Sequence, residues 1–277
     1  MSDFLLAHVT GVRLGAFASV VILMALWEFL APRRVQIHGR ARRWPSNVLI
    51  VAIDAVAVRL LIPISLAEFA AWSASHGWGL LNLWALPAML SVPLAILLLD
   101  LVIYAQHRIF HAVPLLWRLH RMHHSDLEID VTTGARFHPI EIVLSVLLKM
   151  AVIALLGAPA IAVLVFEVLL NATSMFNHSN ARMPDWLDAL VRRLVVTPDM
   201  HRVHHSVVFK ETNSNFGFNL SLWDRLFGTY RPEPKAGQLG MTIGIPSFRD
   251  PAELRLDRML TQPFRDDRTP STARRIS

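Results

Sequence analysis

The sequence predicts an all-α fold: a multi-pass helical membrane protein with a histidine-lined helical cap on the cytoplasmic side. Three observations lead to this prediction. First, 53% of the 277 residues are hydrophobic and the mean hydropathy is +0.42, which is high for a soluble globular protein. Second, four or five apolar stretches approach the roughly 20 residues that span a bilayer. Third, ten of the 13 histidines fall between positions 107 and 205.

The apolar stretches define the membrane-spanning elements in chain order. We expect spans at residues 12–31, 47–72, 80–105, 140–156 and 159–177. The first has Arg13 near its start and lacks the short apolar run and cleavage site of a removable signal peptide. Pro87 and Pro93 are expected to kink the third span. The Gly-Ala-Pro turn at 157–159 predicts that the last two spans form a helical hairpin that is short for a full crossing.

The placement of arginines predicts the orientation. The connection at residues 32–47 carries five arginines and no acid, whereas the connection at 73–79 has no charged residue. Because positively charged loops stay in the cytoplasm, we expect the first connection there. Counting crossings from it puts residues 106–137, the segment from 178 onward and the C-terminus on the same side. Each of the histidine motifs is therefore expected to face the cytoplasm.

Two features of the composition exclude whole classes of site. The chain has no cysteine, which rules out disulfides, thiolate nucleophiles, iron–sulfur clusters and cysteine-ligated zinc. The net charge of +6 does not indicate nucleic acid binding, because the arginines gather beside apolar runs without interleaved aromatic residues. Any metal must therefore be bound by nitrogen and oxygen, and no nucleic acid partner is expected.

Three short motifs contain most of the histidines. HRIFH ends the third apolar stretch, and the phrases HRMHHS and HRVHHS begin at positions 120 and 201. In each phrase the histidines follow the i, i+3, i+4 pattern of one helical face. Pro114 before the first phrase, and Thr197 with Pro198 before the second, predict helix starts. The motifs bring together eight imidazoles: His107, His111, His120, His123, His124, His201, His204 and His205.

Eight imidazoles at these spacings predict a metal site. A single pair of histidines is common on a solvated helix, but crowding eight rings without a cation would cost desolvation energy on each ring. One four-coordinate zinc ion would use at most four of them, so their number indicates two metal ions. Ligation by imidazole alone suits iron, zinc, copper or nickel and does not choose among these metals.

The motifs resemble those of the fatty acid hydroxylase and sterol desaturase superfamily, which has an HxxxH box and two HxxHH boxes. RFHPIE (136–141), FNHSN (176–180) and NSNFGFNLSLWDRLFGTYRP (213–232) are also similar to that family, so the resemblance covers about residues 100–232. It implies that the eight histidines are catalytic ligands of two iron ions in a non-haem site. Such a site activates O2, the co-substrate, and removes hydrogen from an unactivated lipid C–H bond, which begins both hydroxylation and desaturation.

Two further histidines are expected to join the ligands. His178 follows Glu167 and Asn171 on one face of the fifth span, where polar residues are usually functional. The alternative for His178 is a hydrogen-bonded core histidine. His138 precedes Pro139 in RFHPIE. Three carboxylates are expected to hold imidazole rings from behind without binding metal themselves: Asp100, Glu141 and Asp199. The alternative for Asp100 is a residue that pairs two helices.

We expect three parts along the chain. These are N-terminal transmembrane helices in 1–105, a catalytic domain like that of fatty acid hydroxylases in 100–232 with the hairpin 140–177, and a cytoplasmic tail in 233–277. The segment WDRLFGTY (223–230) is expected to pack the cytoplasmic cap over the metals, with Asp224 and Arg225 paired or bonded to the histidine helices. In the tail, residues 250–260 predict a short amphipathic helix, and 261–277 have the composition of a disordered segment.

The chain contains no recognisable flavin, nicotinamide or haem-binding segment. The electrons of such an oxygenase are therefore expected from a separate donor protein of the ferredoxin or cytochrome type. Six arginines are candidates for its docking face or, equally, for contact with anionic lipid headgroups: Arg108, Arg118, Arg121, Arg192, Arg193 and Arg202.

Three other functions share parts of this pattern. A membrane hydrolase or isomerase with histidine-bound zinc uses the same ligands, and metal identity and O2 consumption distinguish it. Carotenoid hydroxylases have similar boxes on shorter chains. A metal transporter is expected to place histidines along the membrane span, whereas nearly all of them lie at one end here.

Overall fold

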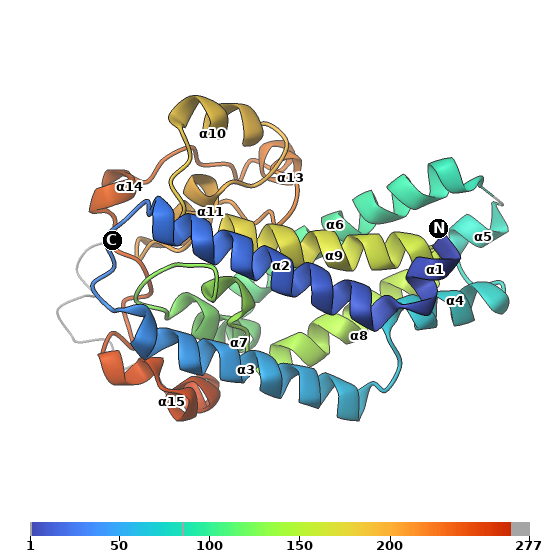
Figure 1. Ribbon diagram of the computed structural model, residues 1–277, viewed down its shortest axis with the longest axis horizontal. Helices are drawn as coiled ribbons and strands as arrows, with labels where there is room; N and C mark the ends of the chain where they lie inside the picture. Colours follow the sequence, from blue (N-terminus) through green and yellow to red (C-terminus); the bar gives the residue numbers. More distant parts are fainter. Residues whose placement is uncertain (1, 85, 267–277) are drawn as a thin grey trace.

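A computed structural model describes residues 2–84 and 86–266. Within these residues the regular structure is helical and no strand is formed, so the predicted all-α fold is confirmed. Long helices run side by side along the molecule, and shorter helices gather at its two ends (Figure 1). The long helices are α2 (Val9–Leu30), α3 (Arg40–Leu61), α6 (Ala88–Ala112), α8 (Pro139–Leu156) and α9 (Ala160–Asn177).

Five segments of the described chain are long and apolar enough to cross a membrane, as the sequence predicted. They are Val9–Leu30, Arg40–Ser75, Ala88–Ala112, Pro139–Leu156 and Ala160–Asn177. The first and the last two agree with the predicted spans to within a few residues. The second and third differ at their boundaries.

The second predicted span, residues 47–72, is not one continuous helix. Helix α3 starts earlier, at Arg40, so the arginine-rich connection is partly helical. It ends at Leu61, and α4 (Leu66–Ser75) follows a break that contains Pro63. Proline lacks the N–H that a continuing helix needs, and a capping box of Ser65 and Glu68 starts the new helix. The hydropathy pattern missed the break because apolar residues continue on both sides of it.

The third predicted span, residues 80–105, is shifted along the chain. Residues Leu80–Leu83 form the separate short helix α5, and α6 begins at Ala88 with Pro87 as its N-cap. Pro87 thus precedes the helix and does not kink it, whereas Pro93 lies inside. Because α6 continues to Ala112, the whole HRIFH motif belongs to this helix.

Helices α8 and α9 form the predicted hairpin. Gly157 ends α8 in the left-handed conformation, with φ of 68°. The tip of the hairpin packs against the segment before α5, where a Cβ atom on Gly79 would lie 1.9 Å from the backbone nitrogen of Gly157. Such a close approach requires glycine. The hairpin therefore extends as far as the connection between α4 and α6, in contrast to the expected short crossing (Figure 1).

A core of apolar side chains fixes the long helices relative to one another. Helices α4, α6, α8 and α9 pack through buried residues that include Leu99, Ile153 and Phe166. Small residues such as Ala95 and Ala162 allow close helix contacts. The histidine-bearing ends of α6 and α9 are thereby held at the same end of the molecule (Figure 1).

The shorter helices at this end form the cap, while α1 (Ser2–Ala7), α4 and α5 lie at the opposite end (Figure 1). The cap elements are α7 (Pro114–His124), η1 (Thr133–Ala135), α10 (Asp185–Val191), α11 (Pro198–His204), α12 (Phe209–Thr212), α13 (Leu222–Leu226), α14 (Gly237–Gly240), η2 (Pro251–Leu254), α15 (Leu256–Thr261) and η3 (Gln262–Phe264).

The C-terminal part of the cap is more ordered than its composition suggested. The predicted amphipathic helix at 250–260 is divided between η2 and α15, and its Leu254 and Met259 are buried. Residues 261–266, expected to be disordered, pack on α7, where Arg118 Nε donates to the carbonyl oxygen of Pro263 at 2.6 Å. Hydrogen bonds between arginine side chains and backbone carbonyls hold this polar segment. The rest of the predicted disordered tail, 267–277, lies outside the described residues.

Candidate metal centre

Four elements carry the histidines to one place. Helix α6 contributes the two histidines of HRIFH from its last two turns, and α7 and α11 contribute those of the repeated phrases, with His205 as the C-cap of α11. His178 is the C-cap of α9. Pro114 and Pro198 occupy the first positions of α7 and α11, as predicted. The side chain of Thr197 accepts a hydrogen bond of 3.3 Å from the backbone nitrogen of Met200 and caps α11.

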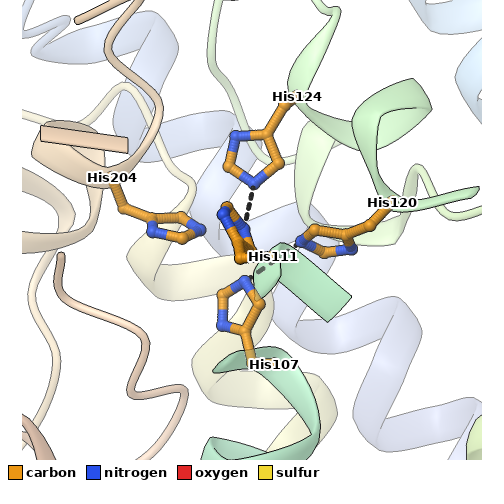
Figure 2. Close-up of side chains that lie close together, drawn as sticks. All are labelled: His107, His111, His120, His124 and His204. Atoms are coloured by element: carbon orange, nitrogen blue, oxygen red, sulfur yellow. Dashed lines mark hydrogen bonds between the residues drawn. The ribbon is translucent and has the colours of Figure 1, made fainter. Parts of the chain in front are cut away.

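Nine histidines form two groups, and within each group the candidate ligand nitrogens all lie within 4.8 Å of one another. The five-histidine group comprises His107, His111, His120, His124 and His204 (Figure 2). The four-histidine group comprises His123, His178, His201 and His205. Eight of the nine are buried and His111 is partly buried. The structure thus brings together all eight box histidines and His178.

Each repeated phrase supplies histidines to both groups. In each phrase the two histidines four residues apart enter one group, and the middle histidine enters the other. The first phrase gives its pair, His120 and His124, to the five-histidine group, whereas the second gives its pair, His201 and His205, to the four-histidine group. Residues i and i+4 lie about 40° apart around a helix, and residue i+3 is rotated about 60° the other way. One phrase used twice can therefore build two adjacent sites.

The outer nitrogens of several rings are held by the backbone. The Nδ1 atoms of four rings donate to carbonyl oxygens: His107 to Phe216 (2.7 Å), His204 to Ser214 (2.7 Å), His123 to Arg136 (3.1 Å) and His178 to Ser174 (2.8 Å). Because a carbonyl oxygen only accepts, each of these Nδ1 atoms carries the proton. The Nε2 lone pairs then face the other histidines, which is the arrangement found around protein-bound metals.

The contact between His123 and His178 points most directly to a cation. Their Nε2 atoms lie 3.1 Å apart, yet both rings already use their N–H toward a carbonyl. Neither neutral ring has a proton to share, and two lone pairs at this distance repel each other. A metal ion that accepts both lone pairs removes the repulsion. The Nε2 atoms of His204 and His205 are also buried without a hydrogen-bond partner in the described chain, as free ligand atoms would be.

Burial keeps the imidazoles of the cap neutral. It lowers the pKa of His120 and of His178 to about 3. It also holds the pKa of the remaining cap histidines well below the usual 6.5, in His123, His124, His201, His204 and His205. The neutral ring is the form that binds metal, so the site is ready for a cation at physiological pH.

One of the three predicted orienting carboxylates contacts a histidine. Glu141, in the first turn of α8, is hydrogen-bonded to His120, with 2.6 Å between Nδ1 and Oε1. This contact fixes the ring of His120 with its Nε2 toward the five-histidine group. The carboxylate therefore has the predicted position behind a candidate ligand.

Asp100 and Asp199 do not hold a histidine, and for Asp100 the alternative of a helix-pairing residue agrees with the structure. Asp100 accepts from the indole nitrogen of Trp223 at 2.8 Å and so ties α6 to α13. Asp199 pairs with Arg33 and Arg202. The helical spacing placed these acids near the histidines, but tryptophan and arginine donors from distant segments satisfy them instead.

His138 lies outside both groups. Its Nδ1 accepts from the backbone nitrogen of Ile140 at 3.3 Å, and its Nε2 donates to the carbonyl oxygen of Leu260 at 3.2 Å. With both ring nitrogens bound to the backbone, no lone pair is directed to a metal. The structure corrects the expected ligand role: His138 caps α8 and connects it to α15.

The segment WDRLFGTY packs within the cap, where Trp223 is buried with Tyr104 and Phe216, but its two charged residues have other partners than predicted. Asp224 accepts from the backbone nitrogens of residues 216 and 217, at 2.8 and 2.9 Å. Arg225 lies over the ring of Tyr230 and does not pair with Asp224. The segment therefore orders the loop whose carbonyl at Phe216 holds His107.

The six arginines expected to form a docking face do not share one surface. Arg121, Arg192 and Arg202 are buried, and their exposed fractions are 2%, 9% and 0%. Arg118 is half-buried against the C-terminal segment. Arg108 and Arg193 are exposed. The predicted docking face is wrong because the buried and half-buried arginines bind carbonyl and carboxylate oxygens. The local sequence does not reveal these partners.

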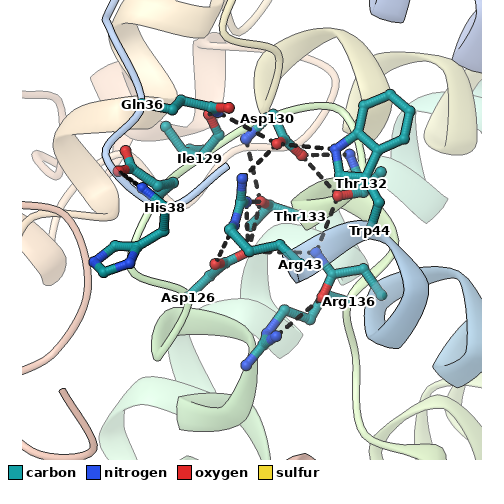
Figure 3. Close-up of polar contacts among 12 residues, drawn as sticks. Gln36, His38, Arg43, Trp44, Asp126, Ile129, Asp130, Thr132, Thr133 and Arg136 are labelled. Atoms are coloured by element: carbon teal, nitrogen blue, oxygen red, sulfur yellow. Dashed lines mark hydrogen bonds and ion pairs between the residues drawn. The ribbon is translucent and has the colours of Figure 1, made fainter. Parts of the chain in front are cut away.

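Sequence reasoning missed a buried polar layer behind the four-histidine group. Arg43 of α3 binds Asp126 and Asp130 in the loop that follows the first phrase (Figure 3). A signal for this layer was present, since the acid-containing stretch SDLEIDVTT (125–133) complements the arginine-rich connection at 32–47.

Five candidate membrane spans and two groups of inward-facing imidazoles define a class of helical membrane proteins with a histidine-rich candidate metal centre. Residues 92–229, which include all three histidine motifs, match the family model described as fatty acid hydroxylase. The chain belongs to the fatty acid hydroxylase family, and it is accordingly an oxidoreductase.

Several curated relatives are hydroxylases or monooxygenases. The chain is 29% identical to ornithine lipid hydroxylase OlsE of Rhizobium tropici over 237 residues, which cover 82% of this chain and 70% of that protein. It is 30% identical to alkylglycerol monooxygenase of Danio rerio over 56% of this chain and 34% of that protein. It is 29% identical to cholesterol 25-hydroxylase of Rattus norvegicus over 53% of this chain and 49% of that protein. No solved structure matches the chain.

Proposed function

We propose that the protein hydroxylates a lipid C–H bond with O2, using two iron ions bound by the five-histidine and four-histidine groups. The proposal depends most on the arrangement of these groups, whose Nε2 atoms face one another at the end of membrane-type helices. The relatives named above, an ornithine lipid hydroxylase, a monooxygenase and a cholesterol hydroxylase, favour hydroxylation over desaturation.

The residues fit a pair of metal ions. Iron bound by the two groups would supply the activation of O2 and the removal of hydrogen from the lipid. The chain's own contribution is to hold the ligands: Glu141 and four backbone carbonyls fix five of the nine rings through Nδ1. Rings fixed in this way already direct their Nε2 atoms toward the other histidines, so they need not rotate before they bind a metal ion.

Aromatic side chains separate the histidines from water. Phe137 stacks on His123 with ring centroids 4.4 Å apart. Phe218 lies 5.0 Å from His107, and Phe216 lies 5.1 Å from His111, again between ring centroids. An apolar wall favours an alkyl chain over water beside the reacting oxygen, and it protects the site from side reactions.

The location of the site suits a membrane lipid. Helices α6 and α9 are candidate spans, and both end at the histidines, so an alkyl chain in the bilayer reaches the site without crossing bulk water. The arginine-rich connection lies at the same end, where Arg33 pairs with Asp199 of α11. By the positive-inside rule this end faces the cytoplasm.

Electrons for the reaction come from a separate protein of the ferredoxin or cytochrome type. The support is the absence of cysteine and of any recognisable flavin, nicotinamide or haem segment in the sequence. The exposed Arg108 and Arg193 are the remaining arginine candidates for contact with an acidic donor or with lipid headgroups.

The test is the origin of the oxygen in the product. Cells that express the protein are grown under ¹⁸O2, and their lipids are compared by mass spectrometry with those of cells that express His123→Ala or His204→Ala. We expect one lipid class to gain a single ¹⁸O atom with the intact protein only. Oxygen taken from water would indicate hydrolytic chemistry, such as that of a zinc enzyme. Full product formation by both variants would contradict the histidine assignment.

A further inference from the structure

A buried ionic network joins the start of α3 to the loop after the first histidine phrase. We call it the Arg43 network, and its members are Arg43, Asn47, Asp126, Asp130, Thr133 and Arg136. Figure 3 labels all of them except Asn47. None of the six is more than 1% exposed. The guanidinium of Arg43 binds both oxygens of Asp126, at 2.7 and 2.8 Å, and also binds Asp130. Two arginines and two aspartates balance the formal charge.

Burying such a network to hold two segments together has a large desolvation penalty. Each buried charge loses its hydration, and apolar residues of the same volume often stabilise a fold as well or better. The forked, bidentate geometry of arginine with a carboxylate does, however, define position and angle. The network is therefore suited to fixing the position of the segments that it joins.

The first structure held by the network is His123. The carbonyl oxygen of Arg136 accepts the Nδ1–H of His123 at 3.1 Å. The side chain of Arg136 donates to the carbonyl oxygen of Met122 at 3.0 Å and to Asn47 Oδ1 at 2.9 Å. Arg136 thus holds His123 through its backbone and the preceding residue through its side chain, while Asn47 ties it to α3.

The second structure held by the network is the end of α9. The network's loop passes so close to α9 that a Cβ atom on Gly134 would lie 2.6 Å from the carbonyl oxygen of Ser174. Ser174 Oγ donates to the carbonyl oxygen of Gly134 at 2.8 Å. The carbonyl oxygen of Ser174 in turn accepts the Nδ1–H of His178 at 2.8 Å. The loop therefore contacts the supports of two members of the four-histidine group.

The five-histidine group is oriented by other partners. Glu141 holds His120, and the carbonyls of Phe216 and Ser214 hold His107 and His204. None of these three partners belongs to the Arg43 network. A change in the network is therefore expected to act on one group more than on the other.

We infer that Arg43 is a positioning residue for the four-histidine group: it fixes the 126–136 loop, and that loop orients His123 and His178. The inference rests on the proposed pair of metal ions. Arg43 touches no candidate ligand, so its effect is transmitted through Asp126, Asp130 and Arg136.

Two mild variants test the inference. Arg43→Lys keeps the charge but loses the fork that binds both oxygens of Asp126. Asn47→Ala removes the bond between α3 and Arg136 without removing a charge. Arg42→Lys is the matched control, because Arg42 is next to Arg43 in the sequence but its own side chain is exposed. Ile153→Ala is a control for general destabilisation, since Ile153 is buried in the distant core of the helices.

The experiment is Co²⁺ titration of the metal-depleted, full-length protein in detergent, with thermal unfolding measured in parallel. The intact protein is expected to bind two ions, and His178→Ala identifies the step that belongs to the four-histidine group. We expect Arg43→Lys and Asn47→Ala to weaken that step by about 10- to 100-fold and to leave the other step unchanged. Arg42→Lys and Ile153→Ala should change neither.

The possible failures are distinguishable. If both steps weaken together, or if Ile153→Ala weakens the same step, the network contributes only to stability and the inference is overturned. Unchanged affinities in Arg43→Lys and Asn47→Ala also overturn it. If the intact protein binds fewer than two ions, the proposed function fails and the inference fails with it.

Discussion

Replacing Glu141 with glutamine measures the contribution of one orienting carboxylate to the metal centre. Glu141 Oε1 lies 2.6 Å from His120 Nδ1, and both residues are buried. Glutamine has nearly the same size and keeps an oxygen acceptor. A cation bound at His120 Nε2 favours the ionised form of the carboxylate behind the ring, and glutamine removes that charge while it leaves the packing around the ring filled.

The expected magnitude follows from the type of hydrogen bond. A hydrogen bond to a charged group contributes about 1.5–3 kcal/mol, and a neutral one contributes about 0.5–1.5 kcal/mol. The difference of about 1–1.5 kcal/mol corresponds to roughly a tenfold change in an equilibrium constant. We expect Glu141→Gln to weaken metal binding in the five-histidine group about tenfold, and Glu141→Ala, which removes the acceptor, to weaken it by up to about 100-fold.

The assay is metal titration of the depleted protein, with lipid product measured on the same samples. Asp100→Asn is the control, because Asp100 is also a buried acid at the histidine-bearing helix but binds Trp223 and no histidine. It should leave metal affinity unchanged. If Glu141→Gln binds metal as tightly as the intact protein, the carboxylate does not orient a ligand and the reasoning is refuted.

Three further predictions follow from the geometry. His138→Gln should retain its full metal content by elemental analysis, because both ring nitrogens of His138 are bound to the backbone. Loss of an ion in this variant would show that His138 is a metal ligand. Burial alone would raise the pKa of Asp126, but the charges of Arg43 and Arg136 hold it below its usual value. Stability from this carboxylate is complete above its unfolded pKa of about 3.9 and is lost as the pH falls below it. The melting temperature should therefore show no effect of Asp126 titration between about pH 5 and 8 and should fall below about pH 4. Asp126→Asn should be less stable at neutral pH with a smaller acid-side fall, and equal stability would contradict the pairing. Finally, the chain has no cysteine, so single cysteines at Val35 and His76 can be labelled uniquely with an impermeant maleimide. Only position 76 should react from outside intact cells, and labelling at both positions would remove a crossing.

The sequence predicted the helices well because long apolar runs need little context. The boundaries depended on single residues. Pro63 broke a run that hydropathy alone would continue, and Pro87 started a helix that the pattern placed earlier. Both helix boundaries follow from the backbone chemistry of proline. They were missed because the apolar residues around each proline form a stretch that looks uninterrupted.

The candidate site was predictable in membership more than in arrangement. The i, i+3, i+4 spacing indicated one face per phrase, and eight of the nine grouped histidines came from it together with the HRIFH pair. Which group each ring joins depends on how α7 and α11 lie against α6 and α9, which spacing does not determine. His123 and His124 are neighbours in sequence, yet they belong to different groups.

The supporting residues were the hardest to predict, because their partners lie far along the chain. Arg43 is 83 positions from Asp126, and Trp223 is 123 positions from Asp100. The sequence offered local spacing for Asp100 and a neighbouring proline for His138, and neither feature specifies a partner. Glu141 does contact His120, because α8 begins directly beside the histidines of α7.

The central claim is that the nine histidines bind two metal ions, one in each group. The most direct test is the number of metal ions per chain in protein purified from iron-supplemented cells, compared with His204→Ala and His178→Ala, each of which alters one group. The account predicts two ions in the intact protein and loss of a different single ion in each variant. One ion or none in the intact protein, or two ions retained by both variants, would contradict it.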